Sequence, residues 1–250
     1  MLSVQIASDI HIEYNNILDP LEVITPSADI LILAGDIGSL YKFEQLTLFL
    51  KSLCSYFQLV LYVPGNHEWY MVPSYEPLAW ETLEKRLYSL ENIIPNLKIL
   101  NRSSIMIDNI CFVGCTLWSE PVGKIPLFIV RINGIKTKEY LTKHKEDLNY
   151  LKHMMQICKK NNHTLIAITH YPPTKEVLTN TSSKKKRFQS MYATNLDYLL
   201  DKSFVQKWIC GHIHKNFDFI SMKGCHIVGN QKGKPKDKII DYKKNFLIEI

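Results

Sequence analysis

The stretch Leu59-Val60-Leu61-Tyr62-Val63-Pro64-Gly65-Asn66-His67-Glu68 joins a short apolar run to a cluster of polar side chains. Its first five residues are apolar and favour strands, which is typical of a strand buried on both faces. The same arrangement occurs twice earlier, where Val4 to Ala7 leads to Asp9-Ile10-His11 and Ile30 to Ala34 leads to Gly35-Asp36. Because the carboxyl ends of parallel strands share one edge of a sheet, we expect these polar side chains to meet there.

Helical patterns alternate with the apolar runs and predict an α/β chain. Apolar residues recur at helical spacing over Phe43 to Phe57, which predicts a strand-helix-strand crossover. The same spacing predicts helices over Tyr75 to Leu90 and Lys138 to Lys160, and the turn at Asp108-Asn109 predicts antiparallel hairpins. The other expected elements are strands at Ile99-Leu100, Ile105 to Ile107, Cys111 to Val113, Leu165 to Thr169, Val205 to Cys210, Phe217 to Ile220, His226 to Val228 and Phe246 to Ile250, and a short helix at Leu196 to Leu200.

The composition is that of a globular protein. The 250 residues are 46% hydrophobic and 22% charged, and they contain no repeat or linker, so we expect a single domain over residues 1–250. No apolar run approaches the roughly 18 residues that suggest a membrane span. The net charge of +6 mildly favours anionic partners without establishing nucleic-acid binding. The six cysteines include no CxxC pair, which predicts reduced thiols in a cytoplasmic protein.

Two further segments carry side chains that bind metal ions. They are Thr169-His170, at the end of an expected strand, and Gly211-His212-Ile213-His214. Asp9 and His11 stand two residues apart, so in an extended backbone both point to the same side and can bind one ion together. The two histidines of the Gly-His-Ile-His segment have the same spacing, so by the same reasoning we expect that they too can bind one ion together. We therefore expect five segments to contribute to one centre.

The donors in these segments are nitrogens and oxygens, with no thiolate, a set that suits divalent ions. We rank manganese ahead of iron, zinc and nickel. Seven donors exceed a tetrahedral site but fit two ions that share a bridging carboxylate. Two ions about 3.5–4 Å apart would clamp a phosphoryl oxygen and lower the pKa of a bridging water, which predicts hydrolysis of a phosphate ester. The donors are Asp9, His11, Asp36, Asn66, His170, His212 and His214.

In this order, the five motifs resemble those of the calcineurin-like metallophosphoesterases, and the resemblance extends from Asp9 to His214. Neighbouring residues, including Thr116-Leu117-Trp118-Ser119, are similar to the small phosphoesterases of undefined substrate in that superfamily. The resemblance implies an α/β fold, a four-layer α/β/β/α sandwich with two mixed sheets. It also implies one ion held by Asp9, His11, Asp36 and His214, and a second held by Asp36, Asn66, His170 and His212.

The resemblance leaves His67 facing the substrate as a catalytic residue. There it would protonate the departing oxygen or stabilise its charge, while a metal-bridging hydroxide attacks phosphorus. The alternative is a histidine that orients a metal ligand without touching substrate. Many family members carry Gly-Asp-x-x-Asp, whereas Ser39 occupies the last position here, so the carboxylate that orients His67 is not identified. Glu68 is expected to brace the turn after His67 or to face solvent.

The sequence defines the substrate less well than the metal centre. The family's protein phosphatases carry an arginine soon after the Gly-Asp motif, and Leu40-Tyr41-Lys42 contains none, which disfavours that class. We therefore prefer a small phosphodiester, such as a cyclic nucleotide or a nucleotide-derived ester, over a phosphomonoester. A nuclease and a non-catalytic scaffold are also considered, although the scaffold conflicts with seven filled donor positions. The oligomeric state is not indicated.

Specificity is expected to depend on loops around the centre. Trp118 and Tyr171 would either stack on a base or pack in the core. The run Lys184-Lys185-Lys186-Arg187 would either form a solvated loop or attract a phosphate-rich substrate.

Overall fold

Eleven strands and four α-helices make up the regular structure of the computed structural model, which describes residues 2–15, 17–178 and 188–250. The basic run at 184–187 lies outside the described residues. The strands are β1 (Ser3–Ala7), β2 (Ile30–Ala34), β3 (Leu59–Val63), β4 (Leu97–Ile99), β5 (Ser103–Ile107), β6 (Ile110–Cys115), β7 (Thr164–Thr169), β8 (Lys207–Ile209), β9 (Phe217–Ile220), β10 (His226–Gly229) and β11 (Leu247–Glu249). The helices are α1 (Ile12–Asn15), α2 (Phe43–Cys54), α3 (Trp80–Ile93) and α4 (Thr137–Lys160).

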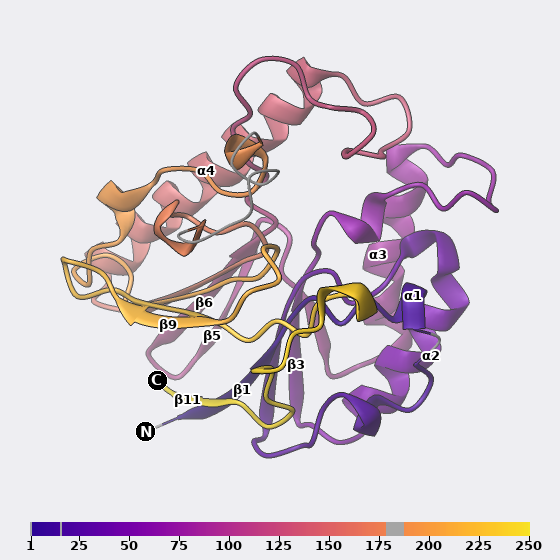
Figure 1. Cartoon of the computed structure of the whole chain (residues 1–250). Coiled ribbons are helices and arrows are strands. Elements are labelled where there is room, and N and C mark those ends of the chain that lie inside the picture. The colour runs from indigo at the N-terminus through magenta and orange to yellow at the C-terminus, as the bar shows by residue number, and fades with distance from the viewer. Residues whose placement is uncertain (1, 16, 179–187) are drawn as a thin grey trace.

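The strands form two mixed sheets that face each other, with helices outside them (Figure 1). The first sheet has the order β11-β1-β2-β3-β4, and the second has the order β5-β6-β7-β8-β10-β9. Among the strands described, the pairings β11–β1, β5–β6 and β9–β10 are antiparallel, and the other pairings, including β3–β4, are parallel. The expected four-layer α/β/β/α arrangement is therefore confirmed. Because β11 pairs with β1, the two ends of the chain lie side by side (Figure 1).

Side chains that point alternately to the two faces of the first sheet build an apolar layer on each face. Leu31 and Leu33 of β2 pack in one cluster with Leu46 of α2, on the outer side of the sheet. Ile30 and Ile32 of the same strand pack against residues of the second sheet. Successive side chains of a strand point to opposite faces, so both faces of β2 are buried, as its unbroken apolar sequence predicts.

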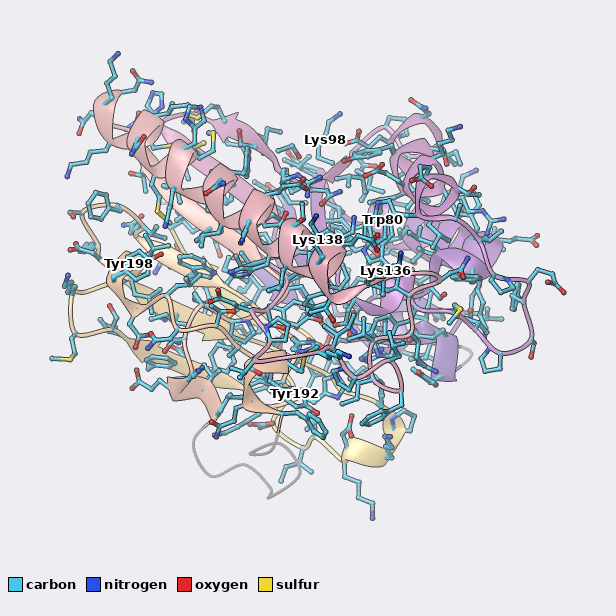
Figure 2. The ribbon with its side chains drawn as sticks, turned by 90° about the horizontal axis from the view of Figure 1, so that it is seen from above. Trp80, Lys98, Lys136, Lys138, Tyr192 and Tyr198 are labelled. Carbon is cyan, nitrogen blue, oxygen red and sulfur yellow. The ribbon has the colours of Figure 1, made fainter. Side chains whose placement is uncertain are left out.

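Helix α4 closes the other side of the molecule. Leu151 and Met155 of α4 pack in one cluster with Val113 and Cys115 of β6. Figure 2 shows this helix from above, with Lys138 at its N-terminal end. All six cysteines are buried as free thiols. None of the helices in the described part of the chain combines the length and apolar content that a membrane crossing requires.

Several boundaries differ from the sequence prediction. Helix α3 begins at Trp80 rather than Tyr75, because Pro77 disfavours helical conformation in the residue before it. Helix α2 ends at Cys54 rather than Phe57. The hairpin at Asp108-Asn109 is confirmed, since Ile107 pairs with Ile110 across it. The strand expected at Ile99-Leu100 is β4, which runs parallel to β3 in the first sheet rather than joining a hairpin.

Candidate metal centre

The parallel strands of both sheets deliver the polar motifs to one region. Asp9, Asp36 and Asn66 follow β1, β2 and β3 of the first sheet, while His170 and His212 follow β7 and β8 of the second. Two hydrogen bonds tie neighbouring motifs together, since Asp9 N donates to Gly35 O at 2.9 Å and Gly211 N donates to His170 O at 3.0 Å. The two sheets thus present one shared edge of side chains.

The backbone at this edge is left-handed rather than extended. Asp9 and His11 have φ values of 54° and 53°, and His212 and His214 have values of 74° and 51°. A residue other than glycine in the left-handed conformation raises the conformational free energy by about 1–2 kcal/mol, so the surrounding hydrogen bonds must stabilise these turns. The expectation that Asp9 and His11 point to the same side because their backbone is extended is therefore wrong. Asp9 and His11 do converge, but through tight turns.

Gly35 shows how closely the motifs pack. Its φ is 89°, and a Cβ added there would lie 2.8 Å from the Cα of Gly65. Any larger residue would be strained by its conformation and would push the Gly35 and Gly65 loops apart. Glycine at this position allows Asp36 to approach the loop that carries Asn66.

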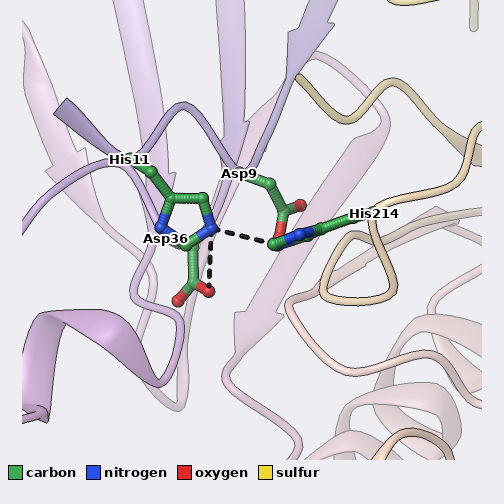
Figure 3. A group of neighbouring side chains, drawn as sticks. All are labelled: Asp9, His11, Asp36 and His214. Atoms are coloured by element: carbon green, nitrogen blue, oxygen red, sulfur yellow. Dashed lines mark hydrogen bonds and ion pairs between the residues drawn. The ribbon is translucent and has the colours of Figure 1, made fainter. Parts of the chain in front are cut away.

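Asp9, His11, Asp36 and His214 form the first donor group, in which one ligand atom from each lies within 4.8 Å of the others. Figure 3 shows these four side chains pointing toward a common centre. His11 Nε2 lies 3.0 Å from His214 Nε2 and 3.6 Å from Asp36 Oδ2. His214 Nε2 lies 3.2 Å from Asp9 Oδ1.

Asp36, His170 and His212 form the second donor group. His170 Nε2 lies 3.4 Å from Asp36 Oδ1, 3.0 Å from Asn66 Oδ1 and 3.2 Å from His212 Nδ1. Asp36 belongs to both groups, as a bridging carboxylate would. His212 and His214 fall into different groups, so the geometric expectation that they bind one ion together is wrong. The division implied by the family resemblance matches these two groups, while a third group, His11, Glu13 and His67, lies beside them.

Each of the four histidines uses one ring nitrogen to contact an acceptor outside the donor groups. Such contacts fix the tautomer and the orientation of histidines that bind metals. The other nitrogens lie 3.0 Å and 3.2 Å apart between the rings. In the neutral form of the rings each of these nitrogens offers a lone pair to a cation, so the donor set fits metal ions. The outer contacts are His11 Nδ1 to Glu13 Oε1, His214 Nδ1 to Asp237 Oδ2, His170 Nδ1 to Ala34 O and His212 Nε2 to Met191 O.

The two aspartates are held in their ionised form. Burial alone would raise the pKa of Asp9, but the hydrogen bond and charge of His214 outweigh burial and lower that pKa to about 2. Burial acts on Asp36 in the same direction, and the charges of His170 and His67 outweigh it, so its pKa falls well below the usual range. Ionised carboxylates are the form that binds cations.

His67 stands beside the donor groups and is oriented by a carboxylate that the sequence did not identify. Its backbone N–H donates to Asp36 Oδ1 at 2.7 Å, and its Nδ1 donates to Glu13 Oε1 at 3.1 Å. Its Nε2 lies 2.9 Å from Lys234 Nζ. Burial is the largest influence on its pKa and lowers it to about 4. Ser39 instead accepts a hydrogen bond from the N–H of Tyr41.

Glu13 is a candidate functional residue that the sequence did not reveal. Its Oε1 also accepts from His11 Nδ1 at 3.0 Å, so one carboxylate orients both histidines. Burial would raise the pKa of Glu13, but the hydrogen bonds from His11 and His67 lower it to about 2. The available signal was the continuation of the first motif, Asp9-Ile10-His11-Ile12-Glu13, with a carboxylate two residues after the histidine.

Glu68 and the nearby aromatic residues have mainly structural contacts. The Glu68 carboxylate is fully buried and accepts from the N–H groups of Gly65, Asp36 and Ile37, so the predicted brace is confirmed. Trp118 packs against Tyr171 in the core. Tyr171 also contacts the His212 ring, with 3.9 Å between ring centroids.

A cavity of about 710 Å³ opens over His67 and the donor groups. Its wall combines aromatic rings with positive charges, a pairing that suits an anion attached to a large organic group. The motifs supply part of the lining, and segments between the motifs or after them supply the aromatic and basic residues. Tyr192 of this wall is labelled in Figure 2. The wall includes Tyr14, Tyr70, Phe128, Arg131, Tyr192 and Lys234.

The chain shares its fold and sequence features with known proteins. It is 26% identical over 254 residues to the uncharacterized protein L509 of Acanthamoeba polyphaga mimivirus, with 90% of this chain and 89% of that protein covered. The phosphopantetheinyl hydrolase PptH of Mycobacterium tuberculosis has a TM-score of 0.75 and 13% identity, covering 99% of this chain and 95% of that chain. A dimetal phosphatase from Danio rerio has a TM-score of 0.56 and 12% identity, covering 91% of this chain and 86% of that chain.

The model of the calcineurin-like phosphoesterase family matches residues 2–216. That range contains all the motifs from Asp9 to His214 and most of both sheets. The chain therefore belongs to the calcineurin-like phosphoesterase family and is a metal-dependent hydrolase of phosphate esters.

Proposed function

We propose that the protein hydrolyses a small phosphodiester, such as a cyclic nucleotide or a nucleotide-derived ester, with two divalent metal ions. The observation that carries the proposal is the pair of donor groups sharing Asp36 at the floor of the cavity. Manganese is the preferred ion, ahead of iron, zinc and nickel. One ion is held by Asp9, His11, Asp36 and His214, and the other by Asp36, Asn66, His170 and His212.

The proposed chemistry divides between the ions and the protein. When bound, the ions supply positive charge to phosphoryl oxygens and lower the pKa of a coordinated water. His67 presents Nε2 to the cavity and assists the departing oxygen, while Glu13 holds Nδ1 and keeps the ring in place. The backbone N–H of His67 is tied to Asp36, which fixes the distance between His67 and the donor groups.

The cavity supports a diester over a monoester. Its volume of about 710 Å³ exceeds what a phosphate group needs, and aromatic side chains line the region beyond the metal donors. A diester places an organic group on each side of phosphorus, and this wall offers surface for at least one of them. We extend the proposal to a single domain over residues 1–250 that works in the cytoplasm, which the pairing of β1 with β11 and the six buried free thiols support.

A substrate screen with manganese added tests the proposed class. Purified protein would be offered bis(4-nitrophenyl) phosphate, 4-nitrophenyl phosphate, cyclic nucleotides, nucleotide esters, phosphopeptides and oligonucleotides. We expect turnover of diesters to exceed that of monoesters. Faster cleavage of the monoester or of phosphopeptides would overturn the diester proposal. A protein that binds both metal ions and cleaves none of these esters would instead be a scaffold.

Glu13→Ala is expected to lower kcat/KM for the diester about 10–100-fold, because the carboxylate orients both His11 and His67. Part of the loss should appear as weaker metal binding through His11. Glu13→Gln keeps an acceptor oxygen, so its kcat/KM should fall less. Steady-state kinetics and metal analysis would measure both effects, with Glu22→Ala as the control, since Glu22 is an exposed carboxylate of the same terminal region. Wild-type turnover by Glu13→Ala would refute the orienting role.

A further inference from the structure

Lys234 is anchored beside His67 by the segment that follows β10. Its backbone N–H donates to Asp237 Oδ2 at 2.8 Å, and the same oxygen accepts from His214 Nδ1 at 2.5 Å. Pro235 follows and begins a 3₁₀ turn, Pro235–Asp237, the yellow turn near α1 in Figure 1. The position of Lys234 is therefore coupled to a histidine of the first donor group.

The Lys234 side chain points its charge at the catalytic histidine. Nζ lies 2.9 Å from His67 Nε2 and 5.4 Å from the centre of the Tyr14 ring. An ammonium group has no acceptor, so in this contact the lysine donates and Nε2 accepts. Lys234 Nζ therefore occupies the space that Nε2 faces, on the cavity side of His67.

This cation lacks a direct counter-ion in the part of the chain that the structure describes. None of the ion pairs there includes Lys234, although its side chain is half-buried. Burial lowers its pKa, and the more distant charges of Asp36, Glu13 and Asp237 act against that shift. Partly desolvated charges are costly unless they are paired. A cation held in this way at a cavity wall fits an anionic oxygen supplied by a ligand.

We propose that Lys234 is a second catalytic group, whose ammonium donates a hydrogen bond to the oxygen that leaves phosphorus. The proposal rests on the phosphate-ester hydrolysis proposed above. Water oxygen forms a new bond to phosphorus while the bond from phosphorus to the ester oxygen breaks, and the ester oxygen keeps the bonding electron pair. Water loses one proton and the ester oxygen gains one. Lys234 donates directly where that negative charge develops, while His67 accepts from Nζ through Nε2 and holds the ammonium there.

The leaving group provides the test, because charge on a poor leaving group needs more stabilisation than charge on a good one. Lys234→Met would be compared with the wild type on methyl aryl phosphodiesters, from the 4-nitrophenyl ester to the unsubstituted phenyl ester. We expect kcat/KM to fall about 100-fold for the phenyl ester and about 10-fold or less for the 4-nitrophenyl ester. Lys234→Arg keeps the charge and should recover part of the loss. Metal content should match the wild type.

Lys238→Met is the matched control, because it removes one exposed lysine from the same segment and should leave all rates unchanged. An equal loss for every leaving group would overturn the proposal, since it would show that Lys234 only binds substrate. Unchanged rates, or loss of metal ions from Lys234→Met, would also overturn it. A wild-type protein that carries both ions and cleaves no ester would overturn the proposed function and this inference with it, whereas the other outcomes affect Lys234 alone.

Discussion

Asp36→Ala is expected to remove both metal ions and to lower diester hydrolysis about 10⁴-fold. Asp36 places one carboxylate oxygen 3.6 Å from His11 Nε2 and the other 3.4 Å from His170 Nε2, so it is the one aspartate shared by both donor groups. Bound ions contribute several kcal/mol of transition-state stabilisation, and about 1.4 kcal/mol corresponds to a tenfold change in rate. Elemental analysis of the reconstituted protein and steady-state kinetics would measure the two effects.

The effect of Asp36→Ala on metal binding should be separable from an effect on folding. Asp36 is buried and also accepts the N–H of His67, so the variant requires a thermal unfolding curve beside the metal analysis. Asp197→Ala is a suitable control, because Asp197 is exposed and lies away from the cavity. A folded Asp36→Ala protein that retained two ions per chain would rule out the bridging role.

His67→Ala is expected to lower kcat by about 10²–10⁴-fold while both metal ions stay bound. The His67 side chain contacts Glu13 and Lys234 and lines the cavity, and we propose no metal ligand role for it. Its loss therefore removes assistance to the leaving group and leaves the seven donors in place. The measurements are kcat for a diester and metal content on the same preparation.

His153→Ala is the control for this variant, since His153 is exposed on α4. Loss of the ions together with activity would show that His67 supports the centre instead of facing the substrate. Undiminished turnover would show that neither role is correct. The contrast with Asp36→Ala is the informative result, because only one of the two variants should lose metal.

The fold was largely predictable because its central strands, such as β2, are buried on both faces. An unbroken apolar run such as Ile30 to Ala34 has few other environments in a globular protein, and it marks the end of the strand where Asp36 lies. Element boundaries were less predictable. Strand β4 pairs with β3 in the first sheet. Which sheet a three-residue strand joins depends on tertiary contacts that its own sequence does not encode.

The candidate site was predictable in its residues but not in its geometry. Motif order singled out seven candidate donors that the structure brings close together. The left-handed turns at Asp9, His11, His212 and His214 depend instead on hydrogen bonds between distant loops. The two-residue alternation of side chains holds within a strand, but the motifs lie beyond the end of each strand, where it no longer applies. Applying it there placed both histidines of the last motif on one ion.

The residues around His67 were missed for a different reason. Glu13 and Lys234 reach the same imidazole from positions 221 residues apart, as the difference between their numbers shows. Only the folded chain brings α1 next to the segment after β10. The cavity wall was hidden in the same way, because its aromatic and basic residues come from loops without a recognisable motif.

Metal content and turnover measured on one preparation would show whether the protein is a hydrolase with two metal ions. The protein would be stripped of metal, titrated with manganese and assayed at each step with bis(4-nitrophenyl) phosphate, while bound metal is measured by elemental analysis. We expect saturation at two ions per chain, with diester hydrolysis appearing as the sites fill. Saturation at one ion, or turnover that is unchanged after metal removal, would contradict this expectation.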